Sequence, residues 1–230
     1  AVAGLFVGIP RGIDKGLSAP SIRERLAVAQ QVPVLIGLLV TALWATGAYT
    51  VYTFFTPYLT SVTGIEGTHV GIAFFIWGVS AVTGLFLGGT LSDKFGPRAV
   101  MIPAFAFLAL AFISLSATGT YLSGGSALAP VLAAIVIWGL SAWAFFPAQQ
   151  SRLMQVAGAK TASIALSLNA SFMYLGFSLG AMLGSFTLLH APLTSLGLVG
   201  AACEIAALLV VLPTVPRRCV ACLTPAPDAR

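Results

Sequence analysis

One acidic side chain, Glu204, lies in the middle of a long apolar stretch of the sequence. A carboxylate in hydrocarbon is costly, so an acid in such a place is a functional candidate by default. The chemistry open to it is the binding and release of a proton. We therefore take Glu204 as the candidate for proton coupling.

Hydroxyl, amide and aromatic side chains recur at helical spacing in three other apolar stretches. Spacings of three and four residues put such side chains on one helical face, where as a set they favour the lining of a cavity for an uncharged or amphiphilic solute. Singly, Ser and Thr can also bond backbone carbonyls or join helices, and Asn169 could either bridge helices or contact the solute. The candidates are Thr46, Tyr49 and Thr53, then Trp138, Ser141 and Gln149, and finally Ser167, Asn169, Ser171 and Tyr174. A separate glycine face of Gly176, Gly180 and Gly184 predicts helix packing.

No catalytic or metal-binding constellation is visible in the sequence. His69 and His190 lie far apart, with no nucleophile pattern beside them. Cys219 and Cys222 supply two of the four ligands that a zinc site needs, which leaves metal binding or palmitoylation open but favours an inert tail. We expect no enzymatic activity, no cofactor and no metal.

The composition identifies lipid as the solvent. The chain is 58% hydrophobic and 7% charged, whereas soluble domains contain about 25% charged residues. The net charge of +5 is spread in small groups between apolar segments rather than gathered in one patch, so we expect no nucleic-acid partner.

Six stretches reach the roughly 20 apolar residues that a membrane-spanning helix needs. They cover about 33–57, 70–92, 99–118, 129–149, 161–188 and 193–213. All 11 Lys and Arg residues fall in one alternating set of connections, namely 10–32, 93–98, 150–160 and the end after residue 212, and none falls in 58–69, 119–128 or 189–192. The positive-inside rule makes the first set cytoplasmic. We predict a multi-pass membrane protein with a cytoplasmic C-terminus.

The ends of the chain suggest a part of something longer. The apolar run 1–9, which has no initiator Met, resembles the end of a preceding transmembrane helix. Residues 10–32 read as a cytoplasmic central linker that ends in an interfacial helix, in which Ile22, Leu26 and Ala29 share a face. We assign 33–213 to the transmembrane bundle and 214–230 to a cytoplasmic tail.

The charged turn GGTLSDKFGPR, residues 88–98, resembles the signature loop of the major facilitator superfamily. Here Gly89 would permit close packing, Gly96 a chain reversal with positive φ, and Pro97 the first turn of the next helix. Asp93 could accept a hydrogen bond from a neighbouring basic residue or face a helix N-terminus. The matching residues are Gly89, Leu91, Asp93, Lys94, Gly96 and Arg98, and Pro97 replaces one of two usual basic residues. The resemblance implies a conformational latch on the cytoplasmic face, with a plain topogenic turn as the alternative.

The resemblance also implies an all-α fold: a 3+3 inverted repeat of six helices that forms the C-terminal bundle of a twelve-helix transporter. The first and fourth spans would line the central cavity, and the second and fifth would help to line it and pack against the missing N-terminal six-helix half. The sixth would lie at the outside, where Glu204 would have a minor role. The segments LWATGAYTVYTFFTPYL and FFPAQQSRLMQVAG are similar to those of arabinose-efflux and drug-efflux proton antiporters of bacteria, which implies the bacterial inner membrane as the location. The implied function is proton-coupled efflux of a sugar or hydrophobic drug-like solute by alternating access. The alternative is a non-transporting half that acts only as a membrane assembly partner.

Overall fold

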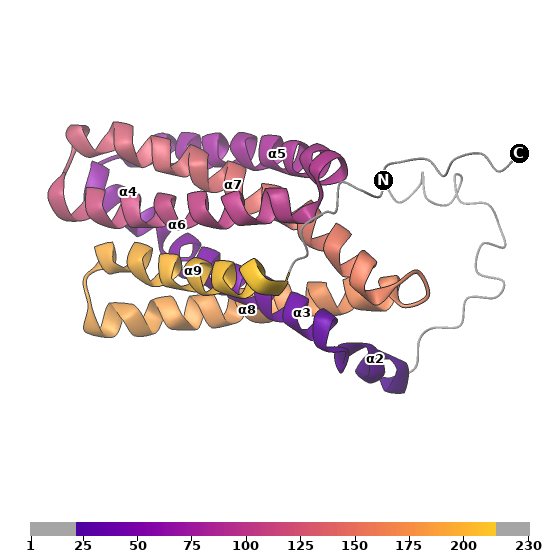
Figure 1. Cartoon of the computed structure of the whole chain (residues 1–230). Coiled ribbons are helices and arrows are strands. Elements are labelled where there is room, and N and C mark those ends of the chain that lie inside the picture. The colour runs from indigo at the N-terminus through magenta and orange to yellow at the C-terminus, as the bar shows by residue number, and fades with distance from the viewer. Residues whose placement is uncertain (1–21, 215–230) are drawn as a thin grey trace, which may run out of the picture.

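The computed structural model describes residues 22–214, and within that range the chain is helical (Figure 1). The predicted preceding helix, most of the linker and nearly all of the tail lie outside the described residues. The helices are α2 (Ile22–Ala29), α3 (Val32–Tyr52), α4 (Phe55–Thr63), α5 (Thr68–Phe95), α6 (Pro97–Tyr121), α7 (Gly125–Ala157), α8 (Ala162–His190) and α9 (Leu196–Thr214), with a 3₁₀ turn at Leu193–Ser195.

Six helices in this range are long and apolar enough to cross a membrane, which confirms the six predicted spans. Two boundaries differ from the prediction. The first span ends at Tyr52 and a new helix, α4, begins at Phe55. The cause is Pro57, which has no N–H to donate to the carbonyl of Thr53. Just before it, the Phe54 N–H bonds to the Val51 carbonyl at 3.2 Å, three residues back along the chain and not four as in an α-helix.

The fourth span is longer than hydropathy predicted, because α7 continues to Ala157. Apolar character marks only the part of a helix that lies in hydrocarbon, whereas backbone hydrogen bonding carries the helix on into polar sequence. Arg152, which the sequence placed in a loop, therefore lies within α7 and is only 3% exposed.

The bundle consists of two three-helix repeats, α3–α5–α6 and α7–α8–α9. The most extensive contacts of α3 are with α8 and α9, and those of α7 are with α5 and α6. By their order in the two repeats, α3 corresponds to α7, α5 to α8 and α6 to α9. The contacts of α3 with α8 and α9 therefore correspond to those of α7 with α5 and α6, and α6 and α9 pack on each other. Since α3 and α7 start from opposite ends of the bundle (Figure 1), the repeats are inverted.

Glycines let the helices of the two repeats approach closely at equivalent crossings. A Cβ at Gly84 or Gly88 of α5 would lie 2.2 Å from the carbonyl oxygen of Leu140 or Ala144 of α7. On the other side, a Cβ at Gly180 of α8 would lie 2.5 Å from the Thr46 carbonyl of α3. The predicted packing role of the α8 glycine face is confirmed, and α5 packs through glycines in the same way.

We expect Gly84→Ala to lower the free energy of unfolding by roughly 1–3 kcal/mol, because the new methyl group meets backbone atoms that can yield only if α5 and α7 separate. Denaturant unfolding in detergent micelles measures this change. Gly78→Ala is the matched control on the same helix, since a Cβ there meets no heavy atom within 4 Å. Equal effects at the two positions would contradict the packing role of Gly84.

Candidate functional site

Aromatic side chains from four helices meet in one cluster, which we call the aromatic wall. Its members are Tyr49 and Tyr52 of α3, Trp77 of α5, Trp138 of α7, and Tyr174 and Phe177 of α8. Tyr49 stacks on Phe177 with ring centroids 3.7 Å apart, and Tyr52 lies 5.3 Å from Trp77. The pairs Tyr49/Tyr52 and Tyr174/Phe177 are spaced three residues apart, so each pair shares a helical face.

The aromatic wall has a buried back and an open front. Trp138 is 1% exposed and contacts Trp77 at 5.8 Å and Tyr52 at 6.2 Å, which fixes the rear of the cluster. Tyr174 is 64% exposed at the front, and its ring meets Phe177 edge-on at 5.6 Å. Such a surface offers ring faces for stacking and phenol groups for hydrogen bonding.

The structure separates the predicted cavity residues into two groups. Six are partly or fully exposed, on α3, on α8 or, for Thr53, on the turn directly after α3: Thr46, Tyr49, Thr53, Ser167, Ser171 and Tyr174. Four are buried within the bundle: Trp138, Ser141, Gln149 and Asn169. Only Tyr49, Tyr174 and Trp138 are members of the aromatic wall. Solute contact by any of the ten stays a prediction.

The hydroxyl groups of Thr46, Thr53 and Ser171 donate to their own helices, the alternative that the sequence had left open for them. The Thr46 hydroxyl donates to the Ala42 carbonyl at 2.8 Å, and the Thr53 hydroxyl to the Tyr49 carbonyl at 2.7 Å. Each oxygen keeps lone pairs that can accept a hydrogen bond. Toward a solute these groups therefore act as acceptors, while the tyrosine hydroxyls of the aromatic wall can donate.

Gln149 and Asn169 belong to a buried polar cluster that joins three helices. The Gln149 amide nitrogen donates to the Gly37 carbonyl at 2.6 Å and lies 2.9 Å from the Thr41 hydroxyl. The Thr41 hydroxyl in turn contacts the Asn169 side-chain oxygen at 2.6 Å. Asn169 thus bridges α8 to α3, and Gln149 bridges α7 to α3.

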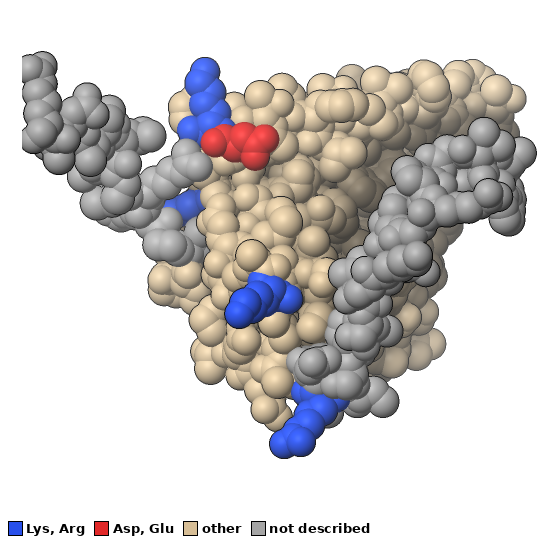
Figure 2. Space-filling view, turned by 90° about the vertical axis from the view of Figure 1, so that its right-hand side faces the viewer, with Lys and Arg blue, Asp and Glu red and all other residues tan. Residues whose placement is uncertain are grey.

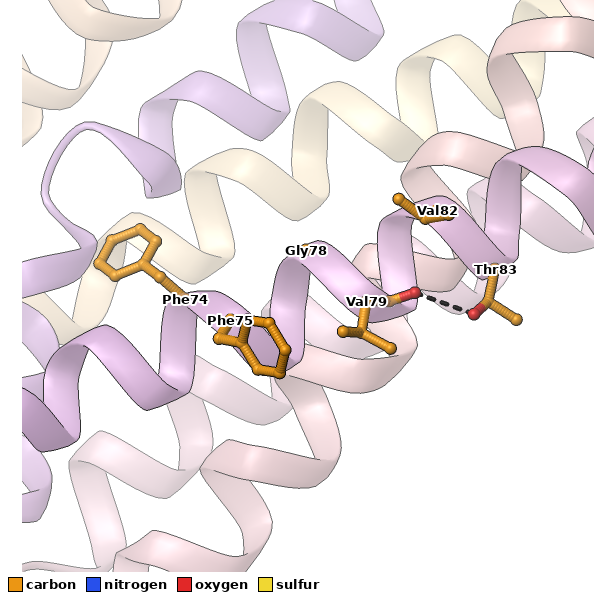
Figure 3. A pocket seen from close by; sticks show the side chains of 6 residues that line it. All are labelled: Phe74, Phe75, Gly78, Val79, Val82 and Thr83. Carbon is orange, nitrogen blue, oxygen red and sulfur yellow. Dashed lines mark hydrogen bonds between the residues drawn. The ribbon is translucent and has the colours of Figure 1, made fainter.

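The helices α5 and α8 are the least buried of the six spans. Within their apolar windows 22% of the residues are buried, compared with 39–67% in the other four. A shallow apolar hollow of about 540 Å³ lies on α5 (Figure 3). It is lined by Phe74, Phe75, Gly78, Val79, Val82 and Thr83. Phe74 also contacts Tyr52 at 5.8 Å, so the hollow borders the aromatic wall.

The signature turn folds as its residue types predicted, with one correction. Gly96 has a φ of +88° and donates its N–H to the Ser92 carbonyl at 2.8 Å, and Pro97 begins α6. Gly89 is not the close-packing glycine, because a Cβ there would meet only Pro147 at 4.0 Å. The close approach falls one residue earlier, at Gly88.

Two arginines converge on the end of α9. Arg98 Nη1 donates to the Leu212 carbonyl at 2.8 Å, and Arg152 Nη2 donates to the Thr214 hydroxyl at 3.2 Å. Cations suit a helix C-terminus, where carbonyls lack partners and the dipole is negative. Figure 2 looks onto this end of the bundle, where Lys and Arg side chains, with acidic atoms beside one of them, stand out from an otherwise uncharged surface.

Glu204 points into the bundle rather than toward its outside. Its side chain is 0% exposed and lies against Gly47 of α3, whose Cβ would fall 2.6 Å from Glu204 Oε1. The resemblance had placed the sixth span at the outside of the bundle and so implied a minor role for this residue; the role of Glu204 in proton coupling stays a prediction.

Tyr52, Trp77 and Phe177 were not among the residues predicted from the sequence. A signal existed, because Tyr52 and Phe177 each lie three residues after a predicted tyrosine. In an apolar chain an aromatic residue is ordinary core or lipid-facing material, so spacing alone does not single it out.

The sequence profile of the Major Facilitator Superfamily matches residues 34–221. The chain is 27% identical over 202 residues to an uncharacterized MFS-type transporter, YbcL, of Bacillus subtilis, covering 87% of this chain and 49% of that protein. It is 31% identical over 189 residues to the inner membrane transport protein YdhP of Escherichia coli K12, covering 80% and 45%. A probable sugar efflux transporter of Mannheimia succiniciproducens is 27% identical over 179 residues, covering 77% and 43%.

The chain therefore spans about half the length of the curated relatives it matches. The profile covers all six membrane spans apart from the first two residues of α3. With six spans arranged as two inverted repeats, the chain belongs to the major facilitator superfamily.

Proposed function

We propose that this chain is one six-helix half of a secondary transporter that exports a small solute in exchange for protons. The observation that carries the proposal is the aromatic wall, which joins the two least buried helices, α5 and α8, through α3 and α7. A solute site between two bundles near the membrane midplane is the arrangement that alternating access requires. Family membership and the names of the relatives support the same function.

The second six-helix half would cover the open faces of α5 and α8. The curated relatives are about twice as long as the matched region, which supports a partner of this size. The aromatic wall would then form one side of an enclosed cavity, and the second half would supply the other side. If the chain acts only as an assembly partner, the alternative function, reconstitution with that half will yield no transport.

The chemistry of the aromatic wall suits an uncharged or amphiphilic solute. None of its six members is acidic or basic, and its rings and hydroxyl groups fit the flat faces and polar edges of a sugar or a drug-like molecule. Export is supported by the relative described as a probable sugar efflux transporter. Glu204 is the candidate proton site, because a carboxyl group buried in the membrane can change its charge during the cycle.

The basic end of the bundle would face the bacterial cytoplasm, with the C-terminus on that side. The described basic residues there include Lys94, Arg98, Arg152 and Lys160, and the connections at the opposite end contain no Lys or Arg. The turn that carries Asp93 would act as the latch against the second half. The name of the Escherichia coli relative, an inner membrane transport protein, supports a multi-pass protein of the inner membrane.

Substitution of a wall residue should weaken solute binding. We expect Tyr49→Ala and Tyr174→Ala to raise the dissociation constant roughly two- to tenfold, because each change removes one stacking ring. The measurement is the solute concentration that gives half-maximal proton movement in vesicles that contain both halves, across a panel of sugars and hydrophobic drugs. Tyr121→Ala is the matched control, since Tyr121 is 82% exposed at the far end of α6. Equal losses in all three variants would contradict a wall-specific site.

Single cysteines should report the orientation. In a background from which the native cysteines have been removed, Lys160→Cys should react with a membrane-impermeant maleimide only from the cytoplasm. His69→Cys should react only from outside, because the two exposed residues lie in connections of opposite sets. The reverse pattern would invert the proposed topology.

A further inference from the structure

The aromatic wall straddles the contact between two groups of helices. By their most extensive contacts, α3, α8 and α9 form one group and α5, α6 and α7 the other. The groups meet through α6 and α9, and also along α3 and α7, a contact that we call the seam. The wall rings on α3 and α8 belong to the first group, and the two wall tryptophans belong to the second. The shape of the wall therefore depends on how α3 is held against α7.

Two pairs of side chains cross the seam at matching positions. Tyr52 meets Trp138 with ring centroids 6.2 Å apart, and Thr41 lies opposite Gln149, with 2.9 Å between the hydroxyl oxygen and the amide nitrogen. Thr41 precedes Tyr52 by 11 residues on α3, and Gln149 follows Trp138 by 11 residues on α7. Eleven residues complete about three helical turns, so the two residues on each helix share a face. The two helices therefore run antiparallel and in register between these pairs.

The Gln149 contact is directional, whereas the ring contact is not. Gln149 Nε2 donates to the Gly37 carbonyl at 2.6 Å and to the Thr41 hydroxyl at 2.9 Å. A slip of one residue moves a helix by about 1.5 Å, which is enough to break hydrogen bonds of this length. Aromatic pairs stay in contact over centroid separations of about 4.5–7 Å, so the Tyr52–Trp138 pair tolerates such a slip.

Gln149 is not arranged for maximum stability. Its side chain is 0% exposed, and its oxygen Oε1 has no hydrogen-bond partner among the residues that the structure describes. A buried acceptor without a partner costs free energy. The best-attested use of buried polar groups that cost stability is to fix the register of packed helices.

We propose that Gln149 is a positioning residue that fixes the register of α3 against α7, and with it the shape of the solute site in the aromatic wall. Asn169 extends the contact to α8, because its side-chain oxygen accepts a hydrogen bond from the Thr41 hydroxyl at 2.6 Å. Solutes that touch rings of both helix groups depend on this register, whereas solutes that touch one group do not. The inference rests on the proposed transport function and names a residue that selects among solutes without contacting them.

Gln149→Met separates positioning from stability. Methionine is similar to glutamine in length and adapts to its surroundings, but it cannot make these hydrogen bonds. The substitution leaves no group unpaired, since the Gly37 carbonyl keeps its helical N–H donor and the Thr41 hydroxyl keeps Asn169. The midpoint of denaturant unfolding should therefore not fall. Thr187→Val is the matched control, because this buried hydroxyl donates only within α8, to the Leu183 carbonyl at 2.8 Å.

The first arm of the test uses no solute. Pulsed electron spin resonance measures distances between pairs of spin labels in the transporter in lipid nanodiscs, after removal of the native cysteines. Labels at the exposed Leu35 and Ser126 lie at opposite ends of α3 and α7 and report sliding. Labels at Leu35 and the exposed Gln155, at the same end, report separation.

We expect narrow distance distributions in the wild type and in Thr187→Val. In Gln149→Met at least one distribution should broaden or shift by roughly 1.5–3 Å, which corresponds to one or two residues of slip. Unchanged distributions in Gln149→Met would overturn the proposal. A lower unfolding midpoint with unchanged distances would show that the hydrogen bonds serve stability alone, which would also overturn it.

The second arm measures binding of a panel of sugars and hydrophobic drugs by quenching of tryptophan fluorescence. In Gln149→Met the order of affinities should change, with roughly two- to tenfold losses for individual compounds, which is the worth of one stacking contact. The order in Thr187→Val should match the wild type. Losses in Gln149→Met without a change in the distances would indicate direct solute contact and overturn the positioning role, as would an unchanged order despite a shift.

The two arms separate this inference from the proposed function. If the distances change but no compound binds to the wild type, the register role of Gln149 stands and the proposed transport function fails. If the distances do not change while compounds bind, the transport function stands and the inference fails.

Discussion

The structure depends on close backbone contact between helices at a few glycines. In lipid, apolar side chains gain little by leaving one hydrocarbon surface for another, so helix association relies on packing at short range. The crossings at Gly84 and Gly88 hold α5 to α7, and that at Gly180 holds α8 to α3. Bulkier residues at these points would separate the helices. The aromatic rings of the wall, which come from these same four helices, would then lose contact with one another.

A few charged groups also hold helices in place. Arg98 and Arg152 lie where α9 ends and its last carbonyls need partners, so they fix that helix at the charged end of the bundle. The anchored helix presents Glu204 to Gly47 at the α3 crossing. Two hydrogen bonds and one tight packing contact therefore connect the charged end of the bundle, the sixth span and the helix that carries Tyr49.

Periodicity and hydropathy predicted the six spans, the Gly96–Pro97 turn and the α8 glycine face, because each depends on local sequence. These patterns did not predict features that depend on contacts outside the local pattern. The end of α3 depends on a missing N–H donor at Pro57, and the burial of Arg152 on the end of α9. The inward direction of Glu204 depends on a glycine in a distant segment. The aromatic wall was only partly foreseen, since a one-dimensional pattern defines a helix face but not the helix that it meets.

In the proposed transporter, the aromatic wall forms the solute site together with a second six-helix half. A cryo-electron microscopy structure of the two halves with a transported solute would locate that site. We expect solute density in contact with Tyr49 and Tyr174, inside a cavity bounded by the open faces of α5 and α8. Density elsewhere, or a second half packed against the wall with no cavity between them, would contradict it.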